Sequence, residues 1–277
     1  MVVESIFRKF RKAIWRPFIA GIKSYDLISE GDSIAVCISG GKDSFLLALL
    51  LKELQKHRVT DFHLSFMVMD PGYMQDDLSL ILANAEKLGI PITVFQSGIF
   101  EVVKDAGGSP CYLCARMRRG HLYSQAQKLG ANKIALGHHL SDVVETTLMG
   151  MLFGSQNQTM MPKLRSKNFR PMELVRPLYC VTEDAILAWK KYNGLEFSGC
   201  ACPLKYKCAS TGDETGSKRQ EVKEILRQLK ERGSRNVEKS VFKSLQMLNL
   251  DTAIGYRKNG REHNFLDDYY MKGDNLP

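Results

Sequence analysis

No stretch of the sequence reaches the roughly 18 consecutive apolar residues that a membrane-spanning helix needs. The longest apolar run, Phe45–Leu51, has the length of a buried helical segment in a globular domain. A secretory leader is not expected either, because basic residues interrupt the apolar positions at the start of the chain. We therefore expect a cytoplasmic protein that makes no contact with a membrane.

A disulfide framework is also missing from the cysteine pattern. The chain has seven cysteines in 277 residues, an odd number, and several of them are closely spaced. Such a pattern is typical of a reducing compartment and of metal or sulfur chemistry. A closed structural zinc site is disfavoured, because the repeated CxxC pairs that such a site uses are not present.

The composition is that of a packed globular protein. Hydrophobic residues make up 44% of the chain and charged residues 25%, which excludes intrinsic disorder. A chain of 277 residues accommodates one large α/β domain, or one domain with added segments. The formal net charge of +9 makes a polyanion a candidate partner.

Strands and helices are expected to alternate through the first half of the chain. Short β-branched apolar runs predict buried strands, and longer apolar or amphipathic runs predict helices. The strands are expected at Ser33–Ile38, Phe62–Met69, Ile92–Phe95 and Lys133–Leu136. The helices are expected at Phe45–Gln55, Leu78–Leu88, Leu113–Leu129 and Val143–Phe153. This alternation predicts the α/β fold class, with a doubly wound, mostly parallel sheet.

A basic helical segment is expected at residues 1–30. Its apolar residues recur every four positions, at Ile6, Phe10, Ile14, Phe18 and Ile22. The apolar stripe is expected to dock on the body of the protein or to serve a homodimer. The basic face between these positions is expected to be solvated or to touch phosphates.

The second half of the chain is expected to be helical and irregular. Residues 155–176 are polar and contain breakers, and helices are expected at Thr182–Tyr192, Lys218–Arg232 and Asn236–Leu248. We therefore divide the chain into the N-terminal segment, an α/β domain at 31–200 and a C-terminal part at 201–277. This last part holds a cysteine loop, basic helices and a tail.

A phosphate-binding loop is expected between the first strand and its helix. The phosphate loop consists of Ser39, Gly40, Gly41, Lys42, Asp43 and Ser44. Its glycines let backbone N–H groups approach an anion, and the helix N-terminus that follows favours negative charge. The GxxxxGK[ST] and GxGxxG patterns of other nucleotide-binding loops are missing.

Two further clusters carry chemistry. Gly137-His138-His139 follows the fourth strand, and Asp142 and Glu145 come next, one helical turn apart. Cys111-Tyr112-Leu113-Cys114 is a CxxC at the head of a helix, and Cys200, Cys202 and Cys208 lie far along the chain. The spacing of the cysteines leaves an iron–sulfur cluster, a zinc ion and a redox or sulfur-transfer pair open.

The phosphate loop resembles the SGGxDS loop of the PP-loop ATP pyrophosphatases, which have an adenine nucleotide alpha hydrolase-like fold. Three further blocks follow in order: PCYLCARMRRG at Pro110–Gly120, LGHHLSD at Leu136–Asp142 and RPL at Arg176–Leu178. As a set, these blocks resemble the tRNA 2-thiocytidine synthetase (TtcA) family. The similarity spans roughly residues 8–230.

This resemblance implies two cofactor sites. ATP and Mg²⁺ would bind to the phosphate loop, with Asp43 at the magnesium ion or the phosphates, and to Gly137, His138 and Asp142. A [4Fe–4S] cluster would be held by Cys111, Cys114 and Cys200, and its fourth iron would be open to a sulfur atom.

Two positions depart from the family pattern. A CxxC is expected at the later cysteine site, but the chain has Cys200-Ala201-Cys202, so Cys202 competes with Cys200 as the third ligand. Ser141 stands where the family has the first of two acidic residues. Both departures leave the identity of the substrate open.

The resemblance implies an ATP-dependent tRNA sulfurtransferase. The enzyme would adenylate a nucleobase carbonyl, with cytidine C2 in the anticodon loop as the expected target, and would release AMP and pyrophosphate. A sulfur donor such as a cysteine desulfurase persulfide or sulfide would be its second partner. The expected contacts of the tRNA are Arg116, Arg118, Arg119, Lys218 and Arg219. The alternatives are a related enzyme that acts on another base or a small molecule, and a nucleotide-binding redox sensor without turnover.

Overall fold

The computed structural model describes residues 1–72, 75–99, 110–197 and 214–271. Six strands form its main sheet: β1 Asp32–Ile38, β2 Phe62–Asp70, β3 Ile92–Gln96, β4 Lys133–Ala135, β5 Lys163–Arg165 and β6 Glu173–Val175. Their order is β3-β2-β1-β4-β6-β5, and every neighbouring pair is parallel except β5 and β6. The predicted mostly parallel α/β fold is confirmed.

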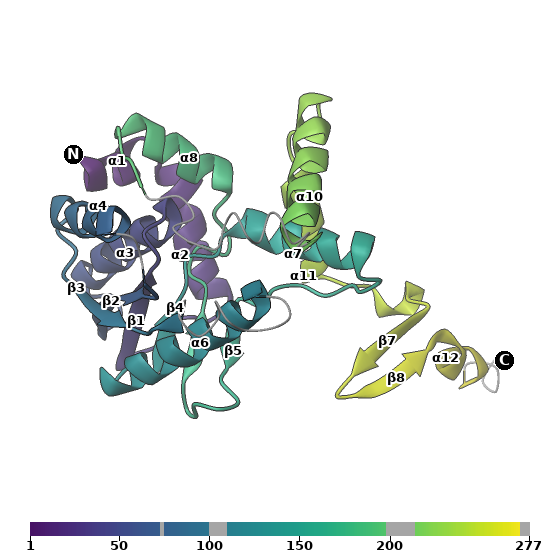
Figure 1. Cartoon of the computed structure of the whole chain (residues 1–277). Helices are drawn as coiled ribbons and strands as arrows, with labels where there is room; N and C mark the ends of the chain where they lie inside the picture. Colours follow the sequence, from purple (N-terminus) through teal and green to yellow (C-terminus); the bar gives the residue numbers. More distant parts are fainter. Residues whose placement is uncertain (73–74, 100–109, 198–213, 272–277) are drawn as a thin grey trace.

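Helices cover both faces of this sheet (Figure 1). The described helices up to residue 246 are α1 Val2–Arg8, α2 Arg16–Ser24, α3 Lys42–Lys56, α4 Gln75–Lys87, α6 Pro110–Lys128, α7 Leu140–Phe153, α8 Glu183–Tyr192, α10 Glu214–Glu231 and α11 Val237–Gln246. A π-helical turn, η1 Arg11–Trp15, joins α1 to α2. The helices predicted from the sequence coincide with these elements to within a few residues at each end.

The central strand β1 shows why the sheet needs both helical layers. Ile34, Val36 and Ile38 belong to the core on one face, under α3 and α8. Ala35 and Cys37 belong to the core on the other face, under α6. A strand that is buried on both faces has no polar side to show, and this explains its unbroken apolar sequence.

The N-terminal segment packs on the first of these faces. Apolar residues spaced exactly four apart would shift around the surface of an α-helix by about 40° from one to the next, because the α-helical period is 3.6 residues. The wider turn η1 counteracts this drift, and the N–H of Phe10 already bonds to the carbonyl of Ser5, five residues back. Ile6, Ile14 and Phe18 are therefore all fully buried in the shared core.

A third core lies where α7 meets the C-terminal helices. Val222 and Leu226 of α10, together with Phe242 of α11, pack against Leu140 and Val143 of α7. Figure 1 shows α10 rising from α7 at the side of the molecule away from β3. This packing attaches α10 to the helix that directly follows β4.

Two regions differ from the sequence expectation. The polar stretch 155–176 contains β5 and β6, whose three residues each are too few to show a periodic pattern. The tail contains a short 3-10 turn (Leu250–Thr252), a hairpin of β7 Gly255–Lys258 and β8 Arg261–Asn264, and α12 Phe265–Met271. Asn259 and Gly260 have φ angles of 52° and 79°, the left-handed values that a two-residue hairpin turn requires.

None of the helices in the described part of the chain is long and apolar enough to cross a membrane.

Candidate active site

The phosphate loop closes on itself at the carboxyl end of β1. Ser44 Oγ donates to the carbonyl of Gly41 at 2.9 Å and accepts from the N–H of Ser39 at 3.2 Å. Gly40 has a φ of 87°, which favours glycine. Gly41 precedes α3 in an extended conformation, and no described side chain caps this helix. The first N–H groups of α3 are therefore available to an anion.

A second glycine lets β4 approach this loop. A Cβ atom on Gly137 would lie 3.1 Å from the carbonyl carbon of Asp43 and 3.1 Å from the N–H nitrogen of Ser44. Both neighbours are backbone atoms, which cannot move aside without shifting the helix start. Gly137 therefore brings the segment after β4 into direct contact with the phosphate loop.

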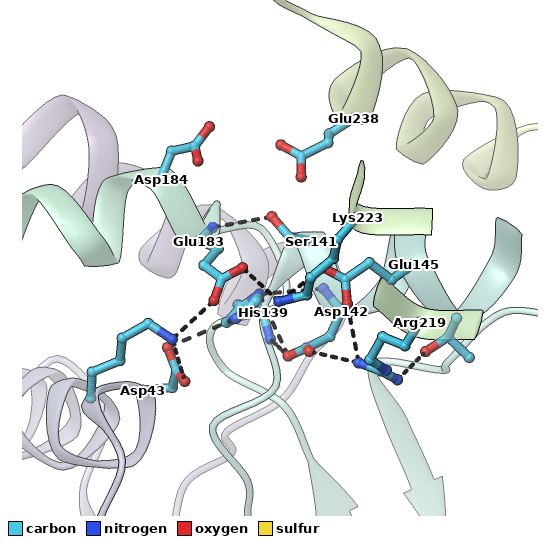
Figure 2. A network of polar contacts seen from close by, with 12 residues as sticks. Asp43, His139, Ser141, Asp142, Glu145, Glu183, Asp184, Arg219, Lys223 and Glu238 are labelled. Atoms are coloured by element: carbon cyan, nitrogen blue, oxygen red, sulfur yellow. Dashed lines mark hydrogen bonds and ion pairs between the residues drawn. The ribbon is translucent and has the colours of Figure 1, made fainter. Parts of the chain in front are cut away.

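Lys42 and Asp43 of the loop take part in a network of charges (Figure 2). Lys42 Nζ lies 3.2 Å from Asp43 Oδ2 and 3.0 Å from Glu183 Oε1 at the start of α8. Burial lowers the pKa of Lys42, but the two carboxylates outweigh this effect and raise it. Burial raises the pKa of Glu183, yet Lys42 and its neighbours bring it down to about 2. Both groups are charged at neutral pH.

His139 holds the start of α7 next to this network. Its Nδ1 accepts from the N–H of Asp142 at 3.3 Å, while Asp142 Oδ2 accepts from the N–H of His139 at 3.0 Å. This is a reciprocal N-terminal cap. Because Nδ1 accepts, the proton is assigned to Nε2, which faces Asp43 Oδ1 at 3.8 Å.

Two cations of α10 extend the network on the other side of Asp142. Arg219 lies 3.2 Å from both Asp142 Oδ1 and Glu145 Oε2. Lys223 lies 3.1 Å from Glu183 Oε2 and 3.6 Å from Glu145 Oε1. Burial raises the pKa of Glu145 to about 7, although both cations oppose this shift. Glu183 thus links Lys42 of the phosphate loop to Lys223 of α10.

Ser141 has a structural role at this junction. Its side chain is buried, and its Oγ accepts from the N–H of Glu183 at 3.1 Å. Thr182 caps α8 by accepting from the N–H of Ala185. The hydroxyl of Ser141 therefore helps to fix Glu183 beside Lys42.

A pocket of about 420 Å³ opens beside the phosphate loop, a size suited to a small ligand. Its lining residues are Cys37, Ile38, Ser39, Asp43, Ser44, Met69, Arg118, Arg119, Leu122, Leu136, Gly137, His138 and Asp142. Burial and the nearby Arg176 lower the pKa of His138 to about 4, so this imidazole is neutral. His138 Nδ1 and Asp43 Oδ1 are buried atoms without a hydrogen-bond partner among the described residues.

Arg176 of the RPL block lies buried near the pocket. Its side chain donates to the carbonyl of Met161, and its backbone N–H donates to the carbonyl of Pro162. Tyr179 donates to the neighbouring carbonyl of Met160 at 2.7 Å. Burial lowers the pKa of Arg176 to about 10, which still leaves it charged.

The helix α6 connects the first cysteine pair to this pocket. Cys111 and Cys114 lie in its first two turns, three residues apart, a spacing that puts them on the same side of a helix. Arg118 follows Cys114 by four residues, about 6 Å along the axis, and Arg118 lines the pocket together with Ser39 and Asp43. Cys200, Cys202 and Cys208 lie outside the described residues.

The structure brings most of the predicted binding residues to one place. Gly137, His138, Asp142 and the serines and Asp43 of the phosphate loop surround the pocket, while Lys42 faces Glu183 beside it. Arg116 is exposed on α6. Glu183 was not among the predicted site residues. Its position in the first turn of a capped helix is the only indication that the sequence gives of it.

Comparisons with known proteins agree with this geometry. The family model of the PP-loop domain matches residues 11–200. The fold and the site therefore define an ATP-binding protein of the PP-loop class, as predicted.

Relatives of known name narrow the class further. The tRNA-cytidine(32) 2-sulfurtransferase of Photobacterium profundum is 38% identical over 247 residues, which cover 87% of this chain and 77% of the relative. The enzyme of the same name from Pelobacter propionicus is 35% identical over 243 residues, which cover 87% and 86%. The chain belongs to the family of tRNA-cytidine(32) 2-sulfurtransferases. The predicted family and enzyme class are confirmed.

A solved structure shares the fold. The U34-tRNA thiolase NcsA from Methanococcus maripaludis, with its [4Fe-4S] cluster, superimposes with a TM-score of 0.63 at 21% identity. The match covers 84% of this chain and 79% of that chain. It confirms the predicted fold class.

Proposed function

We propose that this chain thiolates tRNA, with C2 of a cytidine in the anticodon loop as the acceptor. The C2 oxygen attacks the α-phosphorus of ATP, and pyrophosphate leaves. A sulfur nucleophile then attacks C2, and the original oxygen leaves with AMP. The observation that carries this proposal is the meeting of the phosphate loop and the CxxC helix α6 at one pocket.

The ATP half of the reaction needs charge stabilisation rather than covalent chemistry by the protein. The free N–H groups of α3 and the hydroxyl of Ser39 face the phosphates, and Lys42 offers a cation. Asp43 Oδ1 has no hydrogen-bond partner in the described residues, which fits a carboxylate that binds Mg²⁺. Lys42 must leave Glu183 if it is to reach a phosphate, and Lys223 stays as a partner of Glu183.

The cysteines fit an iron–sulfur cluster by their chemistry. Thiolates are the ligands of such clusters, and Cys111 and Cys114 lie three residues apart in the first two turns of α6. Burial raises the pKa of Cys37 and raises that of Cys180 to about 11, so these two remain thiols. We assign the cluster to Cys111, Cys114 and Cys200, with Cys202 as the competitor for the third position. Bound there, a [4Fe–4S] cluster would supply an open iron that carries sulfur.

The polynucleotide is the third component. Arg118 and Arg119 line the pocket and follow the CxxC along α6, so they would contact an anticodon loop that enters the pocket. Lys218 and Arg219 of α10 are the second predicted contact set. Arg219 is ion-paired with Asp142 and Glu145 in this structure, so the tRNA would have to compete for it. A persulfide or sulfide donor and reduced cysteine thiols both need a reducing compartment. We therefore propose that the protein acts in the cytoplasm.

The test is anaerobic purification with measurement of iron and acid-labile sulfide. We expect stoichiometric iron in the unaltered chain, loss of iron in Cys111→Ala and Cys114→Ala, and retention in the matched control Cys180→Ala. Parallel measurements on Cys200→Ala and Cys202→Ala identify the third ligand. A colourless protein with stoichiometric zinc would contradict the cluster.

The acceptor is tested by mass spectrometry of tRNA nucleosides. The reaction mixture contains the reconstituted enzyme, unmodified tRNA, ATP with Mg²⁺ and sulfide. We expect 2-thiocytidine to form together with AMP and pyrophosphate. Release of AMP without thiolated cytidine would show another acceptor, and absence of AMP with any RNA would contradict an enzyme.

A further inference from the structure

We infer that the solvent-accessible basic side chains of the N-terminal segment and of α8 form a second contact surface for the phosphate backbone of the tRNA. This basic surface consists of Lys9, Lys12, Arg16, Lys190 and Lys191. It rests on the proposed function, because the tRNA bound at the pocket is its ligand. It lies outside the set of arginines and lysines assigned above.

The charges of this surface have no carboxylate partner in the described part of the chain. The first 25 residues hold six lysines and arginines but only one acidic residue, Glu4, which pairs with Arg8. Within the described ranges, Lys9, Lys12, Arg16, Lys190 and Lys191 make no ion pair. By contrast, the cations of α10 that surround the active site, Arg219 and Lys223, are paired with carboxylates.

The spacing of these residues puts like charges next to one another. Lys9 lies at the end of α1, Lys12 in the π-helical turn η1 and Arg16 at the start of α2, so three like charges follow one another within eight residues. Like charges that lie close together repel one another. A polyanion that binds across them removes this repulsion and releases counterions.

The two elements of the surface are joined by an aromatic contact. Lys9 Nζ lies 3.8 Å from the centre of the Tyr192 ring, and Phe10 packs edge-on against the same ring at 5.7 Å. Tyr192 is the last residue of α8, directly after Lys190 and Lys191. Figure 1 shows α1 and α8 side by side at the end of the molecule that carries the N-terminus.

Helix α8 leads from this surface to the active site. Glu183 in its first turn contacts Lys42 of the phosphate loop at 3.0 Å. Lys190 and Lys191 follow seven and eight residues later, which is about 10–12 Å along the helix axis. A tRNA whose anticodon loop enters the pocket is long enough for its backbone to reach this distance.

A membrane surface is the other polyanion that a basic amphipathic helix can bind. Interfacial binding needs the apolar face of the helix to enter the lipid. Here that face is occupied, because Ile6, Ile14 and Phe18 are fully buried in the core beneath the segment. Only the charged side chains remain exposed for binding. These can contact a phosphate backbone but cannot enter the lipid interior.

The experiment compares two charge-matched variants of the full chain for binding to unmodified tRNA. The test variant is Lys12→Ala/Lys191→Ala. The control is Lys128→Ala/Lys167→Ala, which removes two exposed lysines from the part of the molecule where Tyr123 of α6 stacks on Phe169. The dissociation constant is measured over a range of salt concentrations, and thermal unfolding confirms that both variants fold.

We expect the test variant to bind tRNA about tenfold more weakly at physiological salt. The slope of log affinity against log salt should become shallower by about two, one unit for each phosphate group that the variant no longer neutralises. The control should keep the slope of the unaltered chain. Iron content and ATP binding should be unchanged in both variants.

The other outcomes separate the two proposals. Equal affinities and slopes for the test variant and the control would overturn the basic surface but leave the proposed function intact. Failure of the unaltered chain to bind tRNA at all would overturn both. Binding of vesicles rich in phosphatidylserine that is abolished only in the test variant, with tRNA binding retained, would assign the surface to a membrane instead.

Discussion

At the scale of single residues, the active site contains two acidic side chains whose pKa values shift in opposite directions. Glu183 lies between two lysines, which lower its pKa to about 2 despite its burial. Glu145 is more deeply buried, with 3% of its side chain exposed, and its pKa rises to about 7 although Arg219 and Lys223 are close. Glu145 is therefore the carboxyl group of the network that titrates near neutral pH.

Glu145 predicts a particular pH dependence of stability. Below its ordinary pKa of 4.5 the carboxyl is protonated in both the folded and the unfolded chain. Between pH 4.5 and 7 only the unfolded chain loses the proton, so the free energy of unfolding falls as the pH rises, by at most about 3 kcal/mol. In Glu145→Gln this fall should be absent, which makes the variant the more stable protein at pH 8.

The measurement is urea denaturation at pH 5 and at pH 8. Asp142→Asn is the control. The Asp142 carboxylate also pairs with Arg219, but its side chain is less deeply buried than that of Glu145. A Glu145→Gln variant that is less stable than the unaltered chain at pH 8 would show that the ion pairs outweigh the burial of Glu145.

At the scale of elements, the start of α8 is the joint between the phosphate loop and the C-terminal helices. Thr182 caps this helix, Ser141 accepts the N–H of Glu183, and Glu183 contacts both Lys42 and Lys223. Each of these contacts depends on where the first turn of α8 begins. The helix cap thus affects the position of a loop that is distant in sequence.

We predict that Thr182→Ala lowers the free energy of unfolding by about 1 kcal/mol, the usual effect of losing a helix cap. It should also raise the affinity for ATP, because Glu183 would be held less firmly beside Lys42, which has to leave Glu183 to reach a phosphate. Thr182→Ser keeps a capping hydroxyl and should restore both quantities. Calorimetry with a non-hydrolysable ATP analogue measures the affinity, and unchanged binding in the alanine variant would contradict the role of the cap.

At the scale of the whole molecule, residues 249–271 add no side chain to the described cores. The last buried apolar side chain in the described part of the chain is Phe242 of α11. Beyond it, Met247, Leu248, Leu250, Ile254, Phe265, Leu266 and Tyr269 are all exposed. Figure 1 shows the hairpin and α12 set apart from the sheet. The predicted division of the chain into three parts, at residues 30 and 200, stays a prediction.

Removal of residues 249–277 should therefore leave the body of the protein folded. Burial of apolar surface is the main stabilising contribution, and the described residues that this truncation removes include no fully buried apolar side chain. We expect the melting temperature to change by less than about 2 °C. A longer truncation that also removes α11, and with it Phe242 from its contact with α7, should unfold at a clearly lower temperature. A large drop in the melting temperature of the shorter truncation would show that the C-terminal segment packs on the body.

Much of the site could be predicted because its chemistry is local in sequence. A Gly-Gly loop after a buried strand, a CxxC at a helix start and two histidines after another strand each carry their signal within a few residues. The strands β5 and β6 and the hairpin were missed. The first two are too short for a pattern, and the Asn259-Gly260 turn signal was not recognised in a polar tail.

The sequence by itself determined the α/β alternation, the phosphate loop and the family of this protein, because these depend on periodicity and on short motifs. Only the tertiary structure decided that Glu183 faces Lys42, that Gly137 touches the backbone of Asp43, and that α10 supplies paired cations to Asp142 and Glu145. These partners are separated by roughly 70 to 140 positions along the chain. Side chains so far apart meet only when the whole sheet has folded, and no local pattern records which of them will be neighbours.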